Sequence, residues 1–270
     1  MISFLKIAGS VVAVYLVVAG MAAVFQGKLL FPSGMVGPGA PLPPTAERLT
    51  LSVEADEQLV GLHLPAEGPA PEGASLVLGF GGNAWNAHDL ALHLHSIFPD
   101  REVVAFHYRG YGPSTGTPSA RAILNDAPEI HDEIVDRLAP ERITAVGLSL
   151  GVGPAAHLAR SRPITGLVLV TPFDTLTALA REHYPWLPVG LLLRHRMDVA
   201  AELRAVTEPV ALIAAAADTI VPPRRTEPVR KAAEKLVMDR VIAGVGHNDI
   251  YDQAQYRRAM QDALSRIENR

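Results

Sequence analysis

Five residues, Gly147-Leu148-Ser149-Leu150-Gly151, constrain the fold more than any other part of this sequence. They end an apolar, partly β-branched run at residues 143–148 and open a segment at 150–160 that is predicted to be a helix. A G-x-S-x-G sequence between a strand and a helix is typical of a nucleophile elbow, whose tight turn exposes a serine hydroxyl. The flanking glycines avoid collisions with the strained turn. The sequence therefore predicts that Ser149 is a nucleophile.

A second match to the same pattern, Gly112-Pro113-Ser114-Thr115-Gly116, lies in a different context. The strand predicted before it, at residues 103–108, has already ended in a glycine-rich turn. The residues after it are typical of a loop followed by a helix N-cap at Ser119. We therefore interpret Ser114 as a loop serine and Ser149 as the nucleophile.

A serine nucleophile needs a general base, and the base needs an acid that orients it. After a nucleophile elbow, the acid and then the histidine follow along the chain. Asp218 follows an apolar run at 210–217, and His247 follows another at 240–245. Because the carboxyl ends of parallel strands share one edge of a sheet, we expect Ser149, Asp218 and His247 to converge there.

Other interpretations of the acid and the base remain open at this point. Asp174 follows the apolar run 167–171 and is the alternative acid. Asp218 alternatively caps a turn before Pro222, since aspartate is common in turns. His247 is alternatively an ordinary loop histidine, as most of the ten histidines must be. The order of Asp218 and His247 after the elbow favours the triad.

Acyl transfer also needs hydrogen-bond donors for the developing oxyanion. The backbone N–H of Leu150, directly after the nucleophile, is the first expected donor. The second is expected in the loop after the early strand at 75–80, which reads Gly81-Gly82-Asn83-Ala84-Trp85-Asn86. There the N–H of Asn83 is the best candidate. The alternative is an ordinary Gly-Gly turn that leads into a helix.

Several short motifs occur in a characteristic order and spacing. They are Lys28-Leu29-Leu30-Phe31-Pro32, Phe80-Gly81-Gly82-Asn83-Ala84-Trp85-Asn86, Tyr108-Arg109-Gly110-Tyr111-Gly112, Gly147-Leu148-Ser149-Leu150-Gly151, Thr171-Pro172-Phe173, Asp218-Thr219-Ile220-Val221-Pro222 and Gly246-His247-Asn248-Asp249. In these motifs the chain resembles the membrane-anchored α/β-hydrolases of the Bem46/ABHD13/ABHD17 type, within the serine aminopeptidase S33-like group. It differs from the family's F-H-G-N-A-G-N at Gly81, where the family has His, and at Trp85, where the family has Gly. The resemblance implies a serine hydrolase acting on carboxylic esters or thioesters, and several members remove palmitoyl groups from proteins.

The elbow and the resemblance imply the α/β-hydrolase fold, with a short lid and an N-terminal anchor helix, and the pattern of apolar runs predicts a mostly parallel central sheet flanked by helices. Strand-like runs alternate with helical segments, at residues 75–80, 103–108, 143–148, 166–171 and 210–217. Residues 49–53 and 59–64 are predicted to form an antiparallel pair that leads into the sheet, and 251–267 a closing helix. One catalytic domain is expected at 47–270.

Composition excludes several functions. The net charge is −4 without a basic stripe, which argues against nucleic-acid binding. The absence of cysteine excludes thiol catalysis, disulfides and cysteine-ligated zinc. His88, His93 and His95 are predicted to lie on a helix surface rather than to bind a metal, and no cofactor is expected. Arg109 is expected to form structural hydrogen bonds below the site.

The N-terminus is predicted to lie outside the catalytic fold. Residues 7–25 are almost wholly apolar and uncharged, and at ~1.5 Å per residue they nearly cross a ~30 Å hydrocarbon core. We predict an uncleaved anchor at 1–27 in a single-pass protein, with the side of the membrane left open. A cleaved signal peptide and secretion are the alternative, because small residues cluster at 19–23. Residues 28–46 are rich in proline and glycine and are predicted to form a spacer.

The segment at about 175–207 is the predicted lid. Its stretch 184–193 is unusually apolar for a loop. Trp186 and Leu187 in this stretch are predicted to bind substrate by lining an acyl groove. Trp85, in the loop after the early strand, is also predicted to bind substrate. Resting on the bilayer and plain packing of a lid helix over the core are the alternatives. The adjacent Arg194-His195-Arg196 either meets lipid phosphates or forms a solvated edge.

These features together favour a membrane-anchored serine hydrolase that cleaves an acyl ester or thioester through an acyl-Ser149 intermediate. The predicted partners are a small-molecule or lipid-like substrate and a membrane, bound through the N-terminal helix. A serine peptidase of the same fold is the first alternative. A non-catalytic, membrane-tethered scaffold is the second, although a scaffold has no need of a triad and an oxyanion loop.

Overall fold

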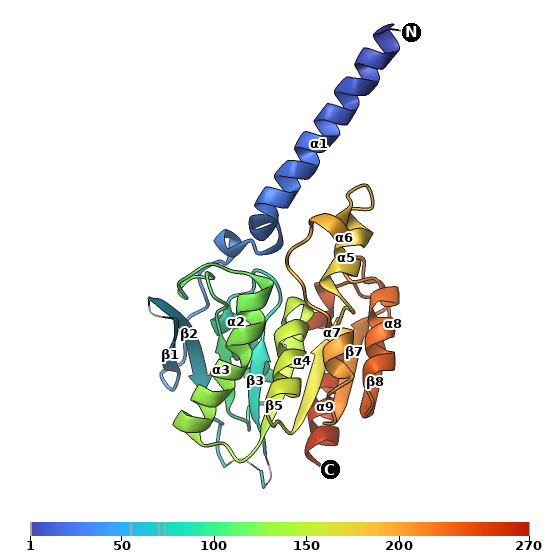
Figure 1. Ribbon diagram of the computed structural model, residues 1–270. Coiled ribbons are helices and arrows are strands. Elements are labelled where there is room, and N and C mark those ends of the chain that lie inside the picture. Colours follow the sequence, from blue (N-terminus) through green and yellow to red (C-terminus); the bar gives the residue numbers. More distant parts are fainter. Residues whose placement is uncertain (1, 55, 70, 73, 270) are drawn as a thin grey trace.

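The computed structural model describes residues 2–54, 56–69, 71–72 and 74–269. In this part of the chain, eight strands form one sheet in the order β1-β2-β4-β3-β5-β6-β7-β8 (Figure 1). The strands are β1 (Glu47–Glu54), β2 (Glu57–Leu64), β3 (Leu76–Phe80), β4 (Val103–Phe106), β5 (Ile143–Leu148), β6 (Gly166–Val170), β7 (Val210–Ala215) and β8 (Leu236–Ile242).

Among these strands, β2 runs against the direction of all the others. It pairs antiparallel with β1 and with β4, and the remaining pairings from β4 to β8 are parallel. Strands β3 to β7 are buried along their whole length, which explains why their sequences are continuous apolar runs. The predicted mostly parallel α/β sheet with a leading antiparallel pair is confirmed.

Helices cover both faces of the sheet. Helices α2 (Ala87–Ile97) and α9 (Ala254–Glu268) pack on one face, and α3 (Ala120–Leu138), α4 (Val152–Ser161), α7 (Val199–Leu203) and α8 (Pro223–Ala232) pack on the other (Figure 1). Neighbouring residues of one strand point to opposite faces, so Val77 joins the cluster beneath α2 and α9 while Leu78 joins the cluster beneath α3 and α4. The sheet is therefore a rigid platform between two hydrophobic cores.

Some strands and helices begin or end at residues other than those predicted. Strands β4 and β7 each end two residues before the predicted ends. Strand β8 occupies Leu236–Ile242 instead of 240–245, because Gly244 adopts a φ of +74° and turns the chain. The charged residues Asp239 and Arg240 interrupt the apolar pattern of this strand, so the sequence did not reveal its full extent. Both residues are exposed because β8 is an edge strand. The predicted closing helix begins later, at α9, after a 3₁₀ turn η3 (Asp249–Asp252).

Two long connections rise beyond the sheet. Residues 171–209, here called the β6–β7 insertion, span the predicted lid and contain α5 (Leu176–His183), α6 (Val189–Leu192) and α7. Helices α5 and α6 lie on the side of the domain that faces α1 (Ile2–Leu30) (Figure 1). The end of α1 is followed by Phe31, whose side chain is only 2% exposed, and by the 3₁₀ turn η1 (Ser33–Met35).

Helix α1 projects away from the domain over most of its length (Figure 1). It continues three residues past the predicted end of the anchor at 27. Its segment Lys6–Leu30 has a mean hydropathy of 2.3 and is long and apolar enough to cross a membrane, by length and composition. Met1 and Arg270, the ends of the predicted anchor and of the predicted domain, lie outside the described residues.

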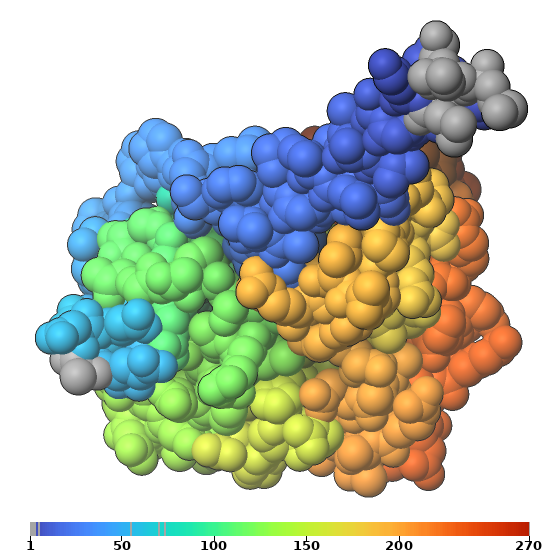
Figure 2. Space-filling view, turned by 45° about the horizontal axis from the view of Figure 1, so that its top comes forward, coloured from blue at the N-terminus to red at the C-terminus, as the bar shows by residue number. Residues whose placement is uncertain are grey.

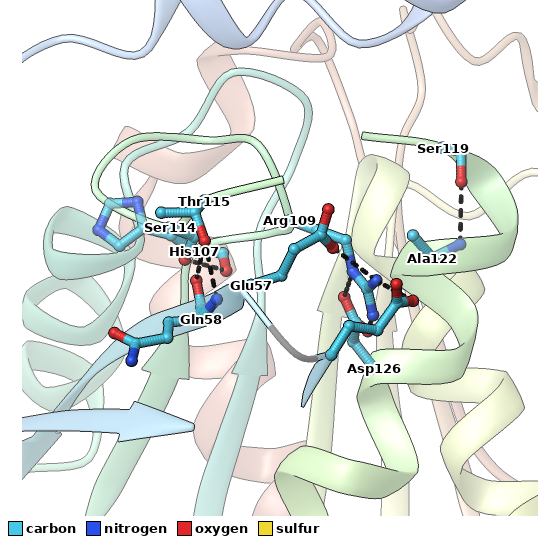
Figure 3. A network of polar contacts seen from close by, with 10 residues as sticks. Glu57, Gln58, His107, Arg109, Ser114, Thr115, Ser119, Ala122 and Asp126 are labelled. Carbon is cyan, nitrogen blue, oxygen red and sulfur yellow. Dashed lines mark hydrogen bonds and ion pairs between the residues drawn. The ribbon is translucent and has the colours of Figure 1, made fainter. Parts of the chain in front are cut away.

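A buried arginine joins three parts of the domain (Figure 3). The Arg109 guanidinium donates to both carboxylate oxygens of Asp126 on α3, at 2.5 and 3.2 Å, and also to Glu54 and Glu57 at the β1–β2 turn, at 2.5 and 2.7 Å. Asp126 is 2% exposed, and burial raises the pKa of its carboxyl while the Arg109 guanidinium opposes that rise. Arg109 thus makes the structural contacts that the sequence suggested.

Replacing Arg109 by Met is expected to lower the free energy of unfolding by about 3–5 kcal/mol, because Asp126 would stay buried without its counterion. Arg137→Met is the matched control. Arg137 is half-exposed and, among the described residues, pairs only with Glu133 across one helical turn, so its loss should cost less than ~1 kcal/mol. Urea denaturation followed by tryptophan fluorescence measures both changes. Equal effects of the two substitutions would contradict a structural role for the Arg109 network.

Unlike Arg109, the buried side chain of His107 has no hydrogen-bond partner among the described residues. His107, just after β4, is 2% exposed, and neither of its ring nitrogens has a partner in the described residues. The ring of His88 meets it edge-on, with centroids 4.8 Å apart. Burial, together with the nearby charges of His88 and Arg48, lowers the pKa of His107 to about 4. His107 is therefore neutral in the native protein over the physiological range.

This histidine is expected to weaken the fold in mild acid. The unfolded chain binds a proton at His107 below pH ~6.5, whereas the native chain does not until about pH 4, so stability falls as the pH drops between these values. The full effect is about 3 kcal/mol. In His107→Phe, the loss of unfolding free energy between pH 7.5 and pH 5 should be smaller than in the parent chain. An unchanged pH dependence in that variant would refute the assignment.

Candidate active site

The predicted elbow forms a sharp turn between β5 and α4. Ser149 opens the 3₁₀ turn η2 (Ser149–Gly151) and has a φ of +51°, in the left-handed region that a serine rarely adopts. Both glycines of the motif are required by close packing. A Cβ on Gly147 would lie 2.6 Å from the carbonyl oxygen of Gly151, and a Cβ on Gly151 would overlap the backbone of Phe80 on β3. The turn therefore tolerates a side chain at Ser149 but at neither glycine.

The three residues predicted as a triad come together at the carboxyl edge of the sheet. Ser149 follows β5, Asp218 follows β7, and His247 follows β8. The Nε2 of His247 lies 2.8 Å from the Ser149 Oγ, and its Nδ1 lies 2.7 Å from Oδ2 of Asp218. Asp218 and His247 are 5% and 7% exposed. Bulk water therefore has little access to the hydrogen bond between them.

The carboxylate of Asp218 is held in place by the backbone. Its Oδ1 accepts hydrogen bonds from the N–H groups of Ile220, at 2.9 Å, and Val221, at 2.7 Å. These bonds leave Oδ2 to accept a hydrogen bond from Nδ1 of His247. With its proton on Nδ1, His247 presents an unprotonated Nε2 to the Ser149 hydroxyl, and this arrangement can accept the hydroxyl proton.

The alternative acid and the alternative serine make other contacts. Asp174 forms an ion pair with Arg225 at 3.2 Å. Ser114 is buried, donates to the carbonyl of His107 and accepts from the N–H of Val60, each at 2.9 Å (Figure 3). These bonds fasten the loop after β4 to β2, so Ser114 lies in a structural loop.

The loop after β3 runs beside the nucleophile. A Cβ added to Gly82 would lie 3.6 Å from the Cβ of Ser149. The side chain of Asn83 donates to the carbonyl of Leu30 at 2.7 Å and accepts from the hydroxyl of Tyr111 at 2.7 Å. The loop is thus tied to the last residue of α1.

Asn83 and Leu150, the predicted oxyanion donors, both line a cavity that also contains Ser149. The hydroxyl of Tyr108 donates to the carbonyl of Gly81 at 2.7 Å, which holds the start of the loop. Burial raises the pKa of the Tyr108 phenol well above its usual value, so this hydroxyl remains a donor. Rigid loops of this kind suit donors that must be aimed before the reaction begins.

Ser149 lies between two cavities. One, of about 420 Å³, is lined by residues 82–85 and by Ile220, Asn248 and Tyr251. The other, of about 210 Å³, is mostly apolar and is lined on one side by residues 29–31 at the end of α1 and on the other by α5. A substrate with one arm on each side of the reacting bond fits this arrangement.

The residues predicted to bind substrate do not share one cavity. Trp85 lines the larger cavity beside Ser149, with its ring against that of Tyr251 at 4.9 Å. Trp186 and Leu187 line a third cavity, of about 260 Å³, between α1 and the β6–β7 insertion, and Ser149 is not among its lining residues. The sequence did not predict that residues 29–31 line a cavity at Ser149. Their place in the motif Lys28-Leu29-Leu30-Phe31-Pro32 was the one signal that they contribute to the site.

The three clustered histidines contact separate neighbours. His88 meets His107, His93 stacks on Tyr256, and the Nε2 of His95 lies 3.0 Å from the carbonyl of Pro65. In the part of the chain that the structure describes, no group of three or more His, Cys, Asp or Glu residues is arranged to hold a metal ion.

The elbow geometry predicts that Gly151→Ala abolishes activity, because the new Cβ would overlap the backbone of Phe80 and displace Ser149. Gly112→Ala, in the other G-x-S-x-G match, is the matched control, since no atom lies within 4 Å of a Cβ there. Hydrolysis of a short acyl ester should fall by on the order of 10²-fold or more in the first variant and remain near the parent value in the second. Equal activities would show that the close approach is dispensable.

Comparison with known proteins agrees with this geometry. A sequence profile of the alpha/beta hydrolase fold matches residues 76–194. An uncharacterized protein of Mycobacterium tuberculosis, Rv2307c, is 34% identical over 272 aligned residues that cover 95% of this chain and 93% of that protein. The lysophosphatidylserine lipase ABHD12 of Danio rerio is 30% identical over 138 residues, or 44% of this chain and 36% of that protein.

Solved structures share the fold at low sequence identity. A bacterial membrane phospholipase A superposes with a TM-score of 0.63 at 16% identity, and the match covers all of both chains. Together with the elbow between β5 and α4, these similarities establish that the chain belongs to the alpha/beta hydrolase family.

Proposed function

We propose that this protein is a membrane-anchored serine hydrolase that cleaves carboxylic ester or thioester bonds through an acyl-Ser149 intermediate. The observation that carries the proposal is the pair of short contacts from Asp218 to His247 and from His247 to Ser149, at 2.7 and 2.8 Å. A non-catalytic scaffold has no need to bury and align these groups. The motifs shared with the Bem46/ABHD13/ABHD17 type support placing the chain in that group.

In the first half of the reaction, Ser149 Oγ attacks the acyl carbonyl carbon while His247 Nε2 takes the hydroxyl proton. Asp218 stabilises the imidazolium that forms. The tetrahedral oxyanion accepts hydrogen bonds from the backbone N–H groups of Leu150 and Asn83. Collapse of this intermediate breaks the bond to the alcohol or thiol, which leaves with the proton from His247. Water then attacks the acyl-Ser149 ester by the same route and releases the carboxylic acid.

The lining of the site favours an acyl substrate over a peptide. The cavity that joins Ser149 to α1 is lined mostly by Leu, Phe, Ala and Val side chains. Among the described residues that line the two cavities at Ser149, no carboxylate is present to bind a substrate amine. The relative ABHD12, by its name, is a lipase of lysophosphatidylserine, an acyl ester. These observations support esters or thioesters of apolar acyl chains as substrates.

Membrane attachment through α1 is part of the proposal. Among the side chains of this helix that the structure describes, twelve large apolar ones are exposed and would be in water if the helix did not meet a membrane: Phe4, Ile7, Val11, Val12, Val14, Tyr15, Leu16, Val17, Met21, Val24, Phe25 and Leu29. The contacts of α1 with the domain support a retained anchor over a cleaved signal peptide. Tyr15, Gln26 and Leu30 all hydrogen-bond to residues of the domain.

Fluorophosphonate labelling of the full-length protein in detergent tests the nucleophile. We expect labelling of the parent chain and of Ser114→Ala, and none of Ser149→Ala. Hydrolysis of a butyryl ester should fall by on the order of 10⁴-fold or more in Ser149→Ala. Circular dichroism checks that each variant is folded. A folded parent chain that neither labels nor hydrolyses any ester would refute the proposed function.

A further inference from the structure

An apolar cavity lies where α1 meets the β6–β7 insertion. Figure 2 shows the two segments side by side, α1 in dark blue and the insertion in yellow to orange. The cavity has a volume of about 260 Å³. Its walls are residues of α1 and of the insertion: Ala22, Ala23, Gln26, Leu29, Leu30, Ala180, Tyr184, Trp186, Leu187, Val189, Leu192 and Leu193. The cavity therefore exists only because α1 closes one side of it.

The amide of Gln26, in this wall, already has hydrogen-bond partners. It donates to the carbonyls of Ala23, at 2.6 Å, and Leu192, at 3.2 Å, and its oxygen accepts from the backbone N–H of Arg194 at 2.7 Å. Most of the remaining wall is hydrocarbon. A ligand here gains mainly from burial of apolar surface, which suits an acyl chain.

The cavity adjoins the 210 Å³ cavity that contains Ser149. Leu29, Leu30, Ala180 and Tyr184 form part of the walls of both cavities. The two cavities therefore lie side by side between Ser149 and the side of α1. The two cavities together reach the size range of ligand sites, about 300–1,000 Å³.

Cationic side chains indicate where the membrane surface meets α1. The guanidinium of Arg194 donates to the carbonyl of Ala23 at 2.9 Å, and Lys28 lies one turn further along the helix. Such groups remain at the level of the lipid headgroups. The twenty residues from Phe4 to Ala23 span about 30 Å of helix, which matches the hydrocarbon thickness of a bilayer.

The tip of the insertion extends beyond this level. The hydroxyl of Tyr15 donates to the carbonyl of Trp186 at 3.1 Å. Tyr15 lies eight residues, or about 12 Å of helix, from Ala23 on the bilayer side. Trp186 and Leu191 are 52% and 84% exposed, which is unfavourable in water but suits a hydrocarbon environment. In a bilayer placed at this level, residues 186–191 lie within the near leaflet, beside the cavity.

We propose that this cavity is a binding site for the distal part of a long acyl chain, and that the chain enters it directly from the bilayer. The inference rests on the proposed function and defines its substrate as a membrane-resident acyl lipid. The carbonyl of the substrate meets Ser149, its chain follows the wall of α1, and its leaving group occupies the cavity beside Trp85. The membrane anchor is then one wall of the substrate site.

Filling the cavity tests this assignment in the full-length protein, reconstituted in phosphatidylcholine vesicles. In Ala22→Trp, the ratio of kcat/KM for a palmitoyl ester to that for a butyryl ester should fall about tenfold or more. A tenfold change corresponds to ~1.4 kcal/mol, the transfer free energy of roughly two methylene groups. Val24→Trp is the matched control, because Val24 is 68% exposed on α1 and does not line the cavity. An unchanged ratio in folded Ala22→Trp would overturn the proposal.

Crosslinking gives an answer even if Ala22→Trp does not fold. A palmitoyl monoglyceride with a diazirine near the end of its chain, added to vesicles that contain Ser149→Ala, should label residues 22–30 and 180–193. Labels confined to residues 4–21 would mean that the chain stays in the bilayer and would overturn the inference. Failure of the proposed function is recognised separately, because the parent chain would then hydrolyse neither ester.

Discussion

The close approach between the elbow and the end of β3 is the constraint on which the rest of the site depends. The backbone of Gly151 lies so near that of Phe80 that no Cβ fits between them. This contact places Ser149 beside the loop that follows β3 and forces its backbone into the left-handed region. Helix α4, which follows the turn, packs on the sheet and thereby holds the strained backbone of the turn in place. A rigid parallel sheet is what makes such strain sustainable.

The same loop connects the site to α1. Asn83 bonds to the carbonyl of Leu30 on one side and to the Tyr111 hydroxyl on the other, so the last turn of α1 and the catalytic edge of the sheet are one structural unit. Burial of Phe31 adds about 1.5–3 kcal/mol to this attachment. In the proposed membrane-anchored enzyme, a tether of this kind would orient the active site on the membrane as well as hold it there, because the end of the helix is fixed relative to Ser149.

Stability and chemistry are served by different polar groups. The Arg109 network joins the β1–β2 turn to α3 through ion pairs of one buried guanidinium. His107 is buried without hydrogen-bond partners among the described residues, which lowers the stability of the fold, and the fold tolerates it as long as the ring remains neutral. The polar groups at Ser149 are instead aligned with one another and open onto cavities. This separation explains why sequence patterns that look alike, such as the two G-x-S-x-G matches, have different environments.

The sequence by itself determined the sheet, the elbow and the order of the proposed triad, because buried parallel strands are continuous apolar runs and because reactive residues follow their carboxyl ends. It misplaced β8, whose exposed charges follow from its position at the sheet edge. Only the tertiary structure decided that α1 closes a cavity against the β6–β7 insertion and that Trp186 and Leu187 line it. The physical reason is that these contacts join residues about 170 positions apart, and no local pattern encodes the packing of one apolar surface against another.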